Sequence, residues 1–145
     1  MSEPEDRFVI APADGPGRWV VHRPVDTERD GYTYTVDVEL DDAGLSARGP
    51  VSLDGRTPEN LRDFLVGLEK DWRGWPGVRS WTSMEEEMTV EARHDGRAHV
   101  SLAVTLRRAD LHHTHDAWSA QVILTVEAGE GLRRIADAAD RLLRP

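Results

Sequence analysis

The chain of 145 residues contains no cysteine, which excludes disulfide bonds, thiol catalysis and metal sites with cysteine ligands. Lysine and side-chain amides are nearly absent as well, since Lys70 is the only lysine and Asn60 and Gln121 are the only amides. A chain of this length still buries about 68–70% of the surface that its unfolded form exposes, so it needs no covalent cross-link. We therefore expect one domain over residues 8–145.

Long hydrophobic runs are absent too. No stretch approaches the ~20 apolar residues of a membrane-spanning helix, so we expect no contact with a membrane. Residues 1–7 are acidic and contain Pro4, which predicts a disordered N-terminus and not a secretory signal. The expected location is the cytoplasm.

Basic residues are fewer than acidic residues. The chain has 18 Lys and Arg residues against 27 Asp and Glu residues, for a net charge of -9. This balance argues against nucleic-acid binding, which depends on neutralising phosphates. It favours a protein partner with a basic surface through electrostatic steering. The same charge also serves solubility without any partner.

Recognisable catalytic and cofactor motifs are missing. The chain contains no GxGxxG, GxxxxGK[ST], HExxH or GxSxG pattern. We therefore predict no cofactor and assign no catalytic residue, and the interpretation leans away from an enzyme.

Two β-hairpins are the clearest features that the chain does have. Apolar and polar residues alternate over residues 32–53, which predicts a hairpin with one apolar face. A four-residue loop would pair Leu40 with Leu45 and would set Asp37 opposite Arg48 on the solvent face.

The second predicted hairpin covers residues 84–106. A three-residue loop would pair Val90 with Val100, which keeps both apolar rows on one face, because a shift of one residue would separate them. This register sets Glu91 opposite His99, a pair that could act as a base with its orienting carboxylate or simply as a solvated cross-strand contact.

The remaining patterns complete an α+β fold. Shorter strand patterns occupy residues 8–11, 18–23, 78–83 and 118–126. Helical spacing predicts helices over 57–73, with Thr57 as the N-cap, and over 130–143. We predict one twisted antiparallel sheet of about six or seven strands, with both helices packed on one face.

Three of the five tryptophans lie in the segment Asp71–Trp81. Trp72 completes the stripe of the first helix and Trp81 lies in a strand, so both are expected in the core. Trp75 lies between Gly74 and Pro76 after the helix, which predicts partial exposure.

An exposed Trp75 flanked by Arg73 and Arg79 would have the composition of a binding hot spot. A small-molecule pocket lined by these rings is the alternative. The acidic run Glu85, Glu86 and Glu87 is a second candidate surface for a basic partner, unless it is only a solvated edge.

A metal site is a further candidate. His112, His113 and His115 fall in one polar loop and could supply imidazole ligands, with Asp110 or Asp116 as an oxygen ligand. Histidines also occur in such loops without any metal, because a site needs fixed geometry.

The segments Asp71–Trp81, Thr89–Gly96 and Val126–Leu132 are similar to a family of small, acidic, uncharacterised actinobacterial proteins common in Streptomyces. The resemblance spans residues 32–143 and implies no known activity. In size, acidity and α+β pattern the chain is also similar in type to bacterial immunity proteins, which neutralise toxins.

These observations predict a non-enzymatic protein-binding function, immunity-like or regulatory. The alternative is a small-ligand-binding protein, or an undescribed enzyme, with a pocket between a helix and a curved sheet.

Overall fold

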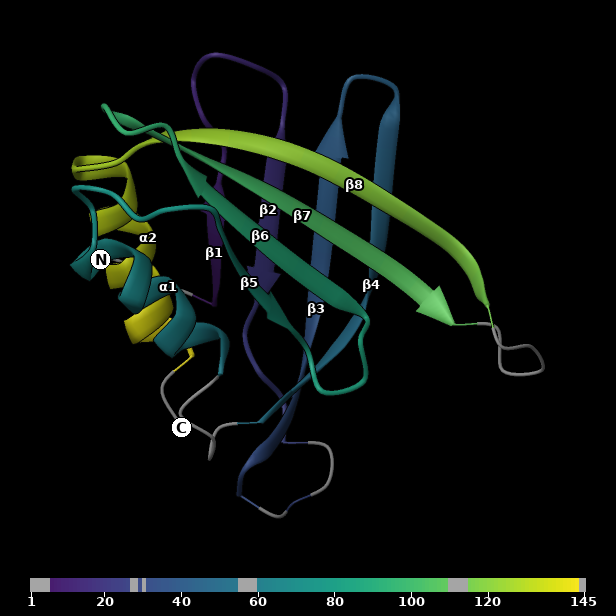
Figure 1. The fold of residues 1–145 in the computed structure, drawn as a ribbon. Coiled ribbons are helices and arrows are strands. Elements are labelled where there is room, and N and C mark those ends of the chain that lie inside the picture. Colours follow the sequence, from purple (N-terminus) through teal and green to yellow (C-terminus); the bar gives the residue numbers. More distant parts are fainter. Residues whose placement is uncertain (1–5, 27–28, 30, 55–59, 110–114, 144–145) are drawn as a thin grey trace, which may run out of the picture.

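The computed structural model describes residues 6–26, 29, 31–54, 60–109 and 115–143. Over these residues the chain forms eight strands and two helices (Figure 1). The strands are β1 (Arg7–Ile10), β2 (Arg18–His22), β3 (Thr33–Asp42), β4 (Leu45–Asp54), β5 (Val78–Thr82), β6 (Met88–His94), β7 (His99–Ala109) and β8 (Asp116–Glu127). The helices are α1 (Leu61–Lys70) and α2 (Glu130–Leu142).

The strands form two antiparallel four-stranded sheets, in the orders β1-β2-β3-β4 and β5-β6-β7-β8. The sheets face each other, with β8 lying over β2 and β3 and β7 lying over β4. Figure 1 shows the strands of the front sheet, β5 to β8, crossing those of the rear sheet, β1 to β4, at a steep angle. The core fills the space between them and includes Trp19, Leu40, Met88 and Leu102, all of which are fully buried.

The predicted α+β class and antiparallel pairing are confirmed, but the prediction of one sheet of six or seven strands is wrong. Alternation in the sequence shows only that each strand has one apolar face. It does not show whether that face meets a helix or a second sheet. Helices of 10 and 13 residues are too small to cover eight amphipathic strands, so the two sheets cover each other.

The helices pack on each other beside the sandwich, and α2 contacts both β1 and β8. In Figure 1 they lie together at the side of the sandwich where β1 runs. The predicted packing of both helices on the face of one sheet is therefore wrong. Arg62 on α1 joins Asp140 on α2 through two hydrogen bonds of 2.6 and 2.8 Å.

The helix bounds are narrower than the predicted ranges 57–73 and 130–143. Asn60 caps α1, because its side chain accepts a hydrogen bond of 2.8 Å from the Asp63 N–H. Thr57 lies outside the described residues. Residues 1–5 of the expected disordered segment also lie outside them, while Arg7 is the first residue of β1.

Both predicted hairpin registers are wrong, although the predicted faces are right. Leu40 pairs with Ala47 instead of Leu45, since the turn holds only Ala43 and Gly44 between the paired ends of β3 and β4. Gly44 has φ +77°, which suits such a tight turn. The cross-strand neighbour of Arg48 is Glu39 and not Asp37.

In the second hairpin Val90 pairs with Val104 instead of Val100. The loop is longer than predicted because Asp95 organises it: its carboxylate accepts hydrogen bonds from the N–H groups of Arg97 and His99. The predicted pair of Glu91 with His99 is therefore wrong, and His99 pairs with Glu127 on β8. The shift is an even number of residues, so every side chain keeps its face.

Candidate functional site

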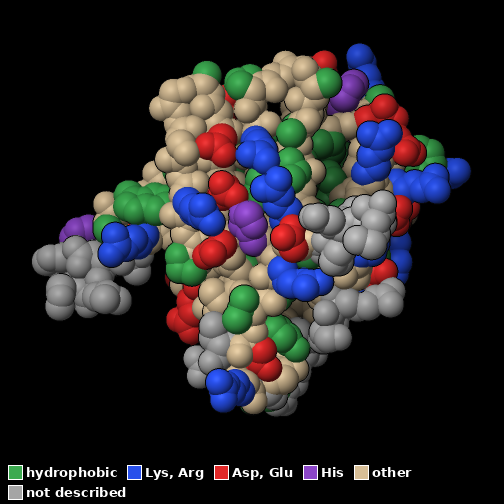
Figure 2. All heavy atoms as spheres, turned by 180° about the vertical axis from the view of Figure 1, so that it is seen from behind, with side chains coloured by type: hydrophobic (Ala, Val, Ile, Leu, Met, Phe, Trp, Pro, Cys, Tyr) green, Lys and Arg blue, Asp and Glu red, His purple; other side chains and the backbone are tan. Residues whose placement is uncertain are grey.

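A hollow lies between α2, the end of β8, and β1 with the connection that follows it. Its volume is about 360 Å³, and we call it the β8 hollow. Buried apolar side chains form its floor, among them Phe8, Ile10, Val126 and Ile135. Figure 2 shows a recess with hydrophobic side chains at its floor in the upper right of the view from behind. A ligand in this hollow would remove apolar surface from water.

Charged and polar side chains stand at the rim of the β8 hollow. Asp14, His99, Glu127 and Arg134 border it, and all four are exposed. Glu130 forms an ion pair of 3.3 Å with Arg134. The rim thus carries two carboxylates and one guanidinium, and Glu130 beside the rim pairs with that guanidinium, so negative charge is in excess there and suits a ligand with a basic group.

The polypeptide edge of β8 also borders this hollow. The Ala128 N–H donates to the Ala98 carbonyl at 2.7 Å, so even-numbered residues at this end of β8 turn their backbone groups toward β7. The backbone groups of Ile123, Thr125 and Glu127 consequently point away from the sheet. Among the described strands, β7 is the only neighbour of β8.

The edge of β1 faces the hollow in the same way. The Arg23 N–H donates to the Asp6 carbonyl, so Phe8 and Ile10 turn their backbone groups toward β2. Val9 therefore directs its N–H and carbonyl outward, and its side chain is 43% exposed. The β8 hollow thus lies between the outer edges of one strand from each sheet.

A smaller hollow of about 160 Å³ continues along β8 beside Ile123 and Thr125. It shares Pro12, Asp14 and Thr125 with the β8 hollow, so the two form a run along the strand edge. The connection between β1 and β2 borders both. It approaches β8 so closely that a Cβ atom at Gly17 would come within 2.8 Å of the Leu124 Cδ2 atom.

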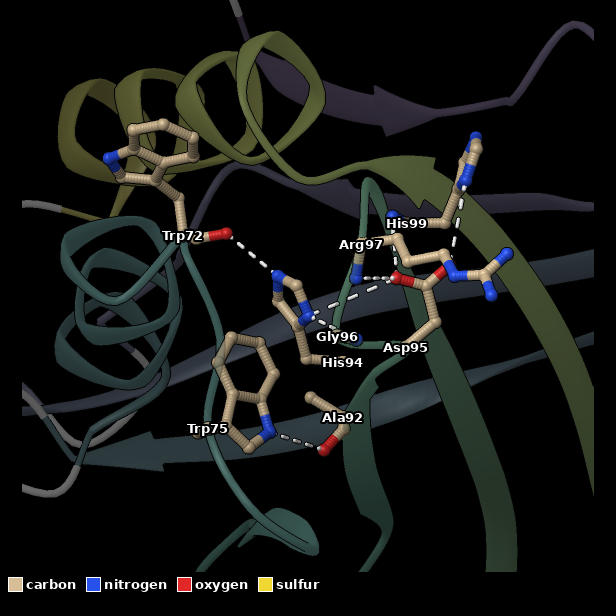
Figure 3. Close-up of polar contacts among 8 residues, drawn as sticks. All are labelled: Trp72, Trp75, Ala92, His94, Asp95, Gly96, Arg97 and His99. Atoms are coloured by element: carbon tan, nitrogen blue, oxygen red, sulfur yellow. Dashed lines mark hydrogen bonds and ion pairs between the residues drawn. The ribbon is translucent and has the colours of Figure 1, made fainter.

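The predicted hot spot around Trp75 is a structural cluster (Figure 3). Trp75 is only 7% exposed, and its indole N–H donates to the Ala92 carbonyl at 3.2 Å. Arg79 lies over this ring at 4.9 Å and forms a hydrogen-bonded ion pair with Asp71 at 2.7 Å. The expected partial exposure of Trp75 is therefore wrong, because the connection after α1 folds back onto the sheet.

His94 joins the end of α1 to the turn after β6, as Figure 3 shows. Its Nδ1 atom accepts the Gly96 N–H at 2.8 Å, so Nε2 carries the proton and donates to the Trp72 carbonyl at 2.7 Å. The ring also meets Trp75 edge-on at 5.2 Å between centroids. A buried imidazole with both nitrogens satisfied holds structure and leaves no nitrogen for catalysis.

Trp72 is more exposed than the sequence predicts, whereas Trp75 is less exposed. It was expected in the core, yet it is 45% exposed, and Arg73 stacks on its ring at 5.2 Å. The helix ends at Lys70, so Trp72 no longer follows the helical stripe. Trp72 and Arg73 are therefore the exposed members of the tryptophan and arginine group in this segment, since Trp75 is buried and Arg79 is half-buried.

The acidic run does not form one open patch. Glu85 and Glu86 are exposed, and Glu86 has φ +63° in the turn between β5 and β6. The Glu87 carboxylate accepts hydrogen bonds from the Ser83 hydroxyl at 2.8 Å and from the Ser52 N–H at 3.0 Å. Glu87 thus connects the two sheets, and its contact covers part of the edge of β4.

The outer face of the rear sheet carries a charged network. His22 Nε2 lies 2.5 Å from Glu39 Oε2, and the hydrogen bond from His22 lowers the pKa of the Glu39 carboxyl below its ordinary value. Nearby Arg48 and Arg18 act in the same direction. Figure 2 shows a histidine side chain among basic and acidic side chains on this face. Neither the β8 hollow nor the smaller hollow beside Ile123 borders this network.

The predicted metal ligands His112 and His113 lie outside the described residues, and His115 is exposed. Within the described ranges no three His, Asp or Glu side chains gather closely enough to hold a metal ion. Neither α1 nor α2 is long and apolar enough to cross a membrane.

No sequence motif marks Asp14, Glu127 or Arg134 as a candidate site residue. His99 is a sequence candidate, but its cross-strand neighbour is Glu127 and not the predicted Glu91. Each belongs to a different element, and their sequence neighbours carry no motif. Only the packing of α2 against β1 and β8 brings them to one rim. The register of β7 against β8, which pairs His99 with Glu127, is the one sequence signal that points to this rim.

A protein-family sequence model described as a family of unknown function, DUF6228, matches residues 16–145. No curated protein and no solved structure matches the chain.

Proposed function

Because the chain belongs to DUF6228, a family of unknown function, we propose a function from its own geometry: it is a non-enzymatic binding protein that holds a segment of a protein partner in the β8 hollow. The observation that carries the proposal is the combination of an apolar floor with a charged rim in one recess. Recognition sites commonly combine apolar burial with a few placed polar groups.

The charge of the site defines the kind of partner. The excess of carboxylates at the rim and the net charge of -9 both favour a segment with a basic side chain. Such a side chain would lie near Asp14 and Glu127. We propose the acidic rim of the β8 hollow, rather than Trp75, as the partner-binding surface.

A small-ligand-binding protein is the second candidate. The size of the β8 hollow favours it, because pockets for small molecules measure about 300–1,000 Å³. The hollow also lies between a helix and a sheet, as that alternative expects. We rank it second because the outer edge of β8 borders the hollow, and most small molecules would leave its hydrogen-bonding groups without partners.

We propose that an immunity-like or regulatory protein of the actinobacterial cytoplasm uses this site to hold a basic partner. A gene for a large toxin-like protein beside this one would support the immunity-like role, and a metabolic operon would oppose it.

The test is selection of displayed random linear peptides on the full-length protein. The Ala138→Trp variant would fill the β8 hollow, since Ala138 lines it and is partly buried. The matched control is Ala43→Trp in the exposed turn between β3 and β4. We expect peptides with a basic residue to be enriched on the wild type and on the control but not on Ala138→Trp. Equal enrichment on all three proteins, or none on any, would sink the proposal.

A further inference from the structure

We infer that the β8 hollow takes its partner by strand addition: an extended segment pairs with the outer edge of β8 along Ile123–Glu127 and sets a basic side chain at the rim. This inference rests on the proposed function and names its mode of recognition. Strand addition uses backbone hydrogen bonds for affinity and side-chain pockets for specificity.

The hydrogen-bonding groups along the hollow favour strand addition. Ile123, Thr125 and Glu127 direct their N–H and carbonyl groups outward, at the spacing of every second residue. The β8 hollow borders Thr125 and Glu127, and the smaller hollow borders Ile123 and Thr125. An extended polypeptide presents groups at the same spacing, so its backbone is complementary to this edge.

The outer edges of β1, β4, β5 and β8 differ in how they are protected. Native proteins protect exposed edges with short strands, proline, charges or covering segments. β1 and β5 are short, at 4 and 5 residues. β4 contains Pro50, and Glu87 accepts its Ser52 N–H.

β8 is neither short nor interrupted by proline in the stretch that borders the hollows. It has 12 residues and contains neither proline nor glycine. Its outward-facing Ile123 is 60% exposed. An edge of this length and character is suited to pairing with another strand.

The shape and charge of the two hollows favour one extended segment of another protein as the occupant. The run of hollows is bounded by α2 on one side and by the connection between β1 and β2 on the other, which suits a single narrow strand. The net charge of -9 opposes association with a second copy of this chain. A basic segment from another protein meets both constraints.

The experiment removes one backbone donor from each edge. Thr125→Pro deletes an outward-facing N–H, and its side-chain control is Thr125→Ala. Proline is tolerated at edge positions that face away from the sheet, and thermal unfolding of each variant checks that the fold is kept. Val9→Pro removes the corresponding donor from β1. The probe is the most enriched display peptide, resynthesised, with its affinity measured by calorimetry.

We expect Thr125→Pro to weaken binding about tenfold or more, as the loss of a backbone hydrogen bond implies, and Thr125→Ala and Val9→Pro to change it about threefold or less. N-methylation of a peptide N–H should abolish binding only where that N–H faces β8, which is at every second residue of the peptide. Binding that Ala138→Trp removes but Thr125→Pro leaves intact would overturn strand addition while leaving the proposed function standing. Peptide-free association of the protein through β8, seen by light scattering and lost in Thr125→Pro, would identify a second copy as the occupant and overturn the inference.

Discussion

At the scale of single residues, the tryptophans show how a short connection decides exposure. Trp72 and Trp75 are three positions apart, yet one is 45% exposed and the other 7%. The helix ends at Lys70, and Gly74 with φ +139° redirects the chain toward the sheet. Local composition predicted the opposite assignment, because exposure here depends on the direction in which the connection folds.

Trp75→Ala should therefore destabilise the protein by about 3–5 kcal/mol, the usual cost of removing a buried aromatic side chain. Trp72→Ala, the matched control, should change stability by less than about 1 kcal/mol because its ring is largely in solvent. Urea unfolding of both variants measures the difference. Equal losses in the two variants would contradict the burial of Trp75.

Asp95 gives the loop between β6 and β7 a dependence on pH. Hydrogen bonds from the backbone N–H groups of Arg97 and His99 lower the pKa of its carboxyl below the ordinary value. A lowered pKa in the folded state means that this stabilisation is present above the ordinary value near 4 and is lost as the pH falls through the folded value.

We expect Asp95→Asn to remove this pH dependence, because an amide oxygen still accepts the two N–H groups but does not titrate. The stability difference between wild type and variant should therefore shrink or change sign as the pH falls below about 4, with the wild type losing more. Thermal unfolding across that range measures it. A constant difference would show that the carboxylate does not hold the loop.

At the scale of elements, the two hairpins show what alternation can and cannot predict. It placed the apolar residues of β3, β4, β6 and β7 on the correct faces. It did not give the register, because shifting a strand by an even number of residues preserves every face. In the second hairpin the register follows from the Asp95 loop, whose side-chain hydrogen bonds alternation does not encode.

The turn between β5 and β6 makes a contact between sheets that can be tested. Glu87→Ala would leave the buried Ser83 hydroxyl and the Ser52 N–H without their acceptor. We expect a loss of about 1–3 kcal/mol in the free energy of unfolding. Glu85→Ala removes an exposed carboxylate from the same turn and should stay within about 0.5 kcal/mol. Denaturant titration of both variants measures the two losses in free energy of unfolding. Similar losses would argue against a stabilising contact of Glu87 with Ser83 and Ser52.

At the scale of the whole molecule, both sheets share one core. Buried side chains from β2, β3, β6, β7 and β8 belong to a single hydrophobic cluster, which also includes residues of α1 and α2. Removing either sheet would expose the apolar face of the other. We therefore expect one cooperative unfolding transition.

Far-ultraviolet circular dichroism reports the strands and helices, and tryptophan fluorescence reports the surroundings of the five tryptophans, of which Trp19, Trp75 and Trp81 are buried. The two thermal transitions should coincide, and the calorimetric and van't Hoff enthalpies should agree. Two separated transitions would show instead that the sheets unfold independently.

The sequence by itself determined the α+β class, the antiparallel strands, the two helices and the faces of most strands, because periodicity is a property of neighbouring residues. Tertiary structure decided the rest. The division into two sheets depends on which apolar faces meet, and the burial of Trp75 depends on the path of a connection. The rim of the β8 hollow brings Asp14 beside Glu127 and Arg134, and no local pattern records a distance between residues so far apart in the sequence.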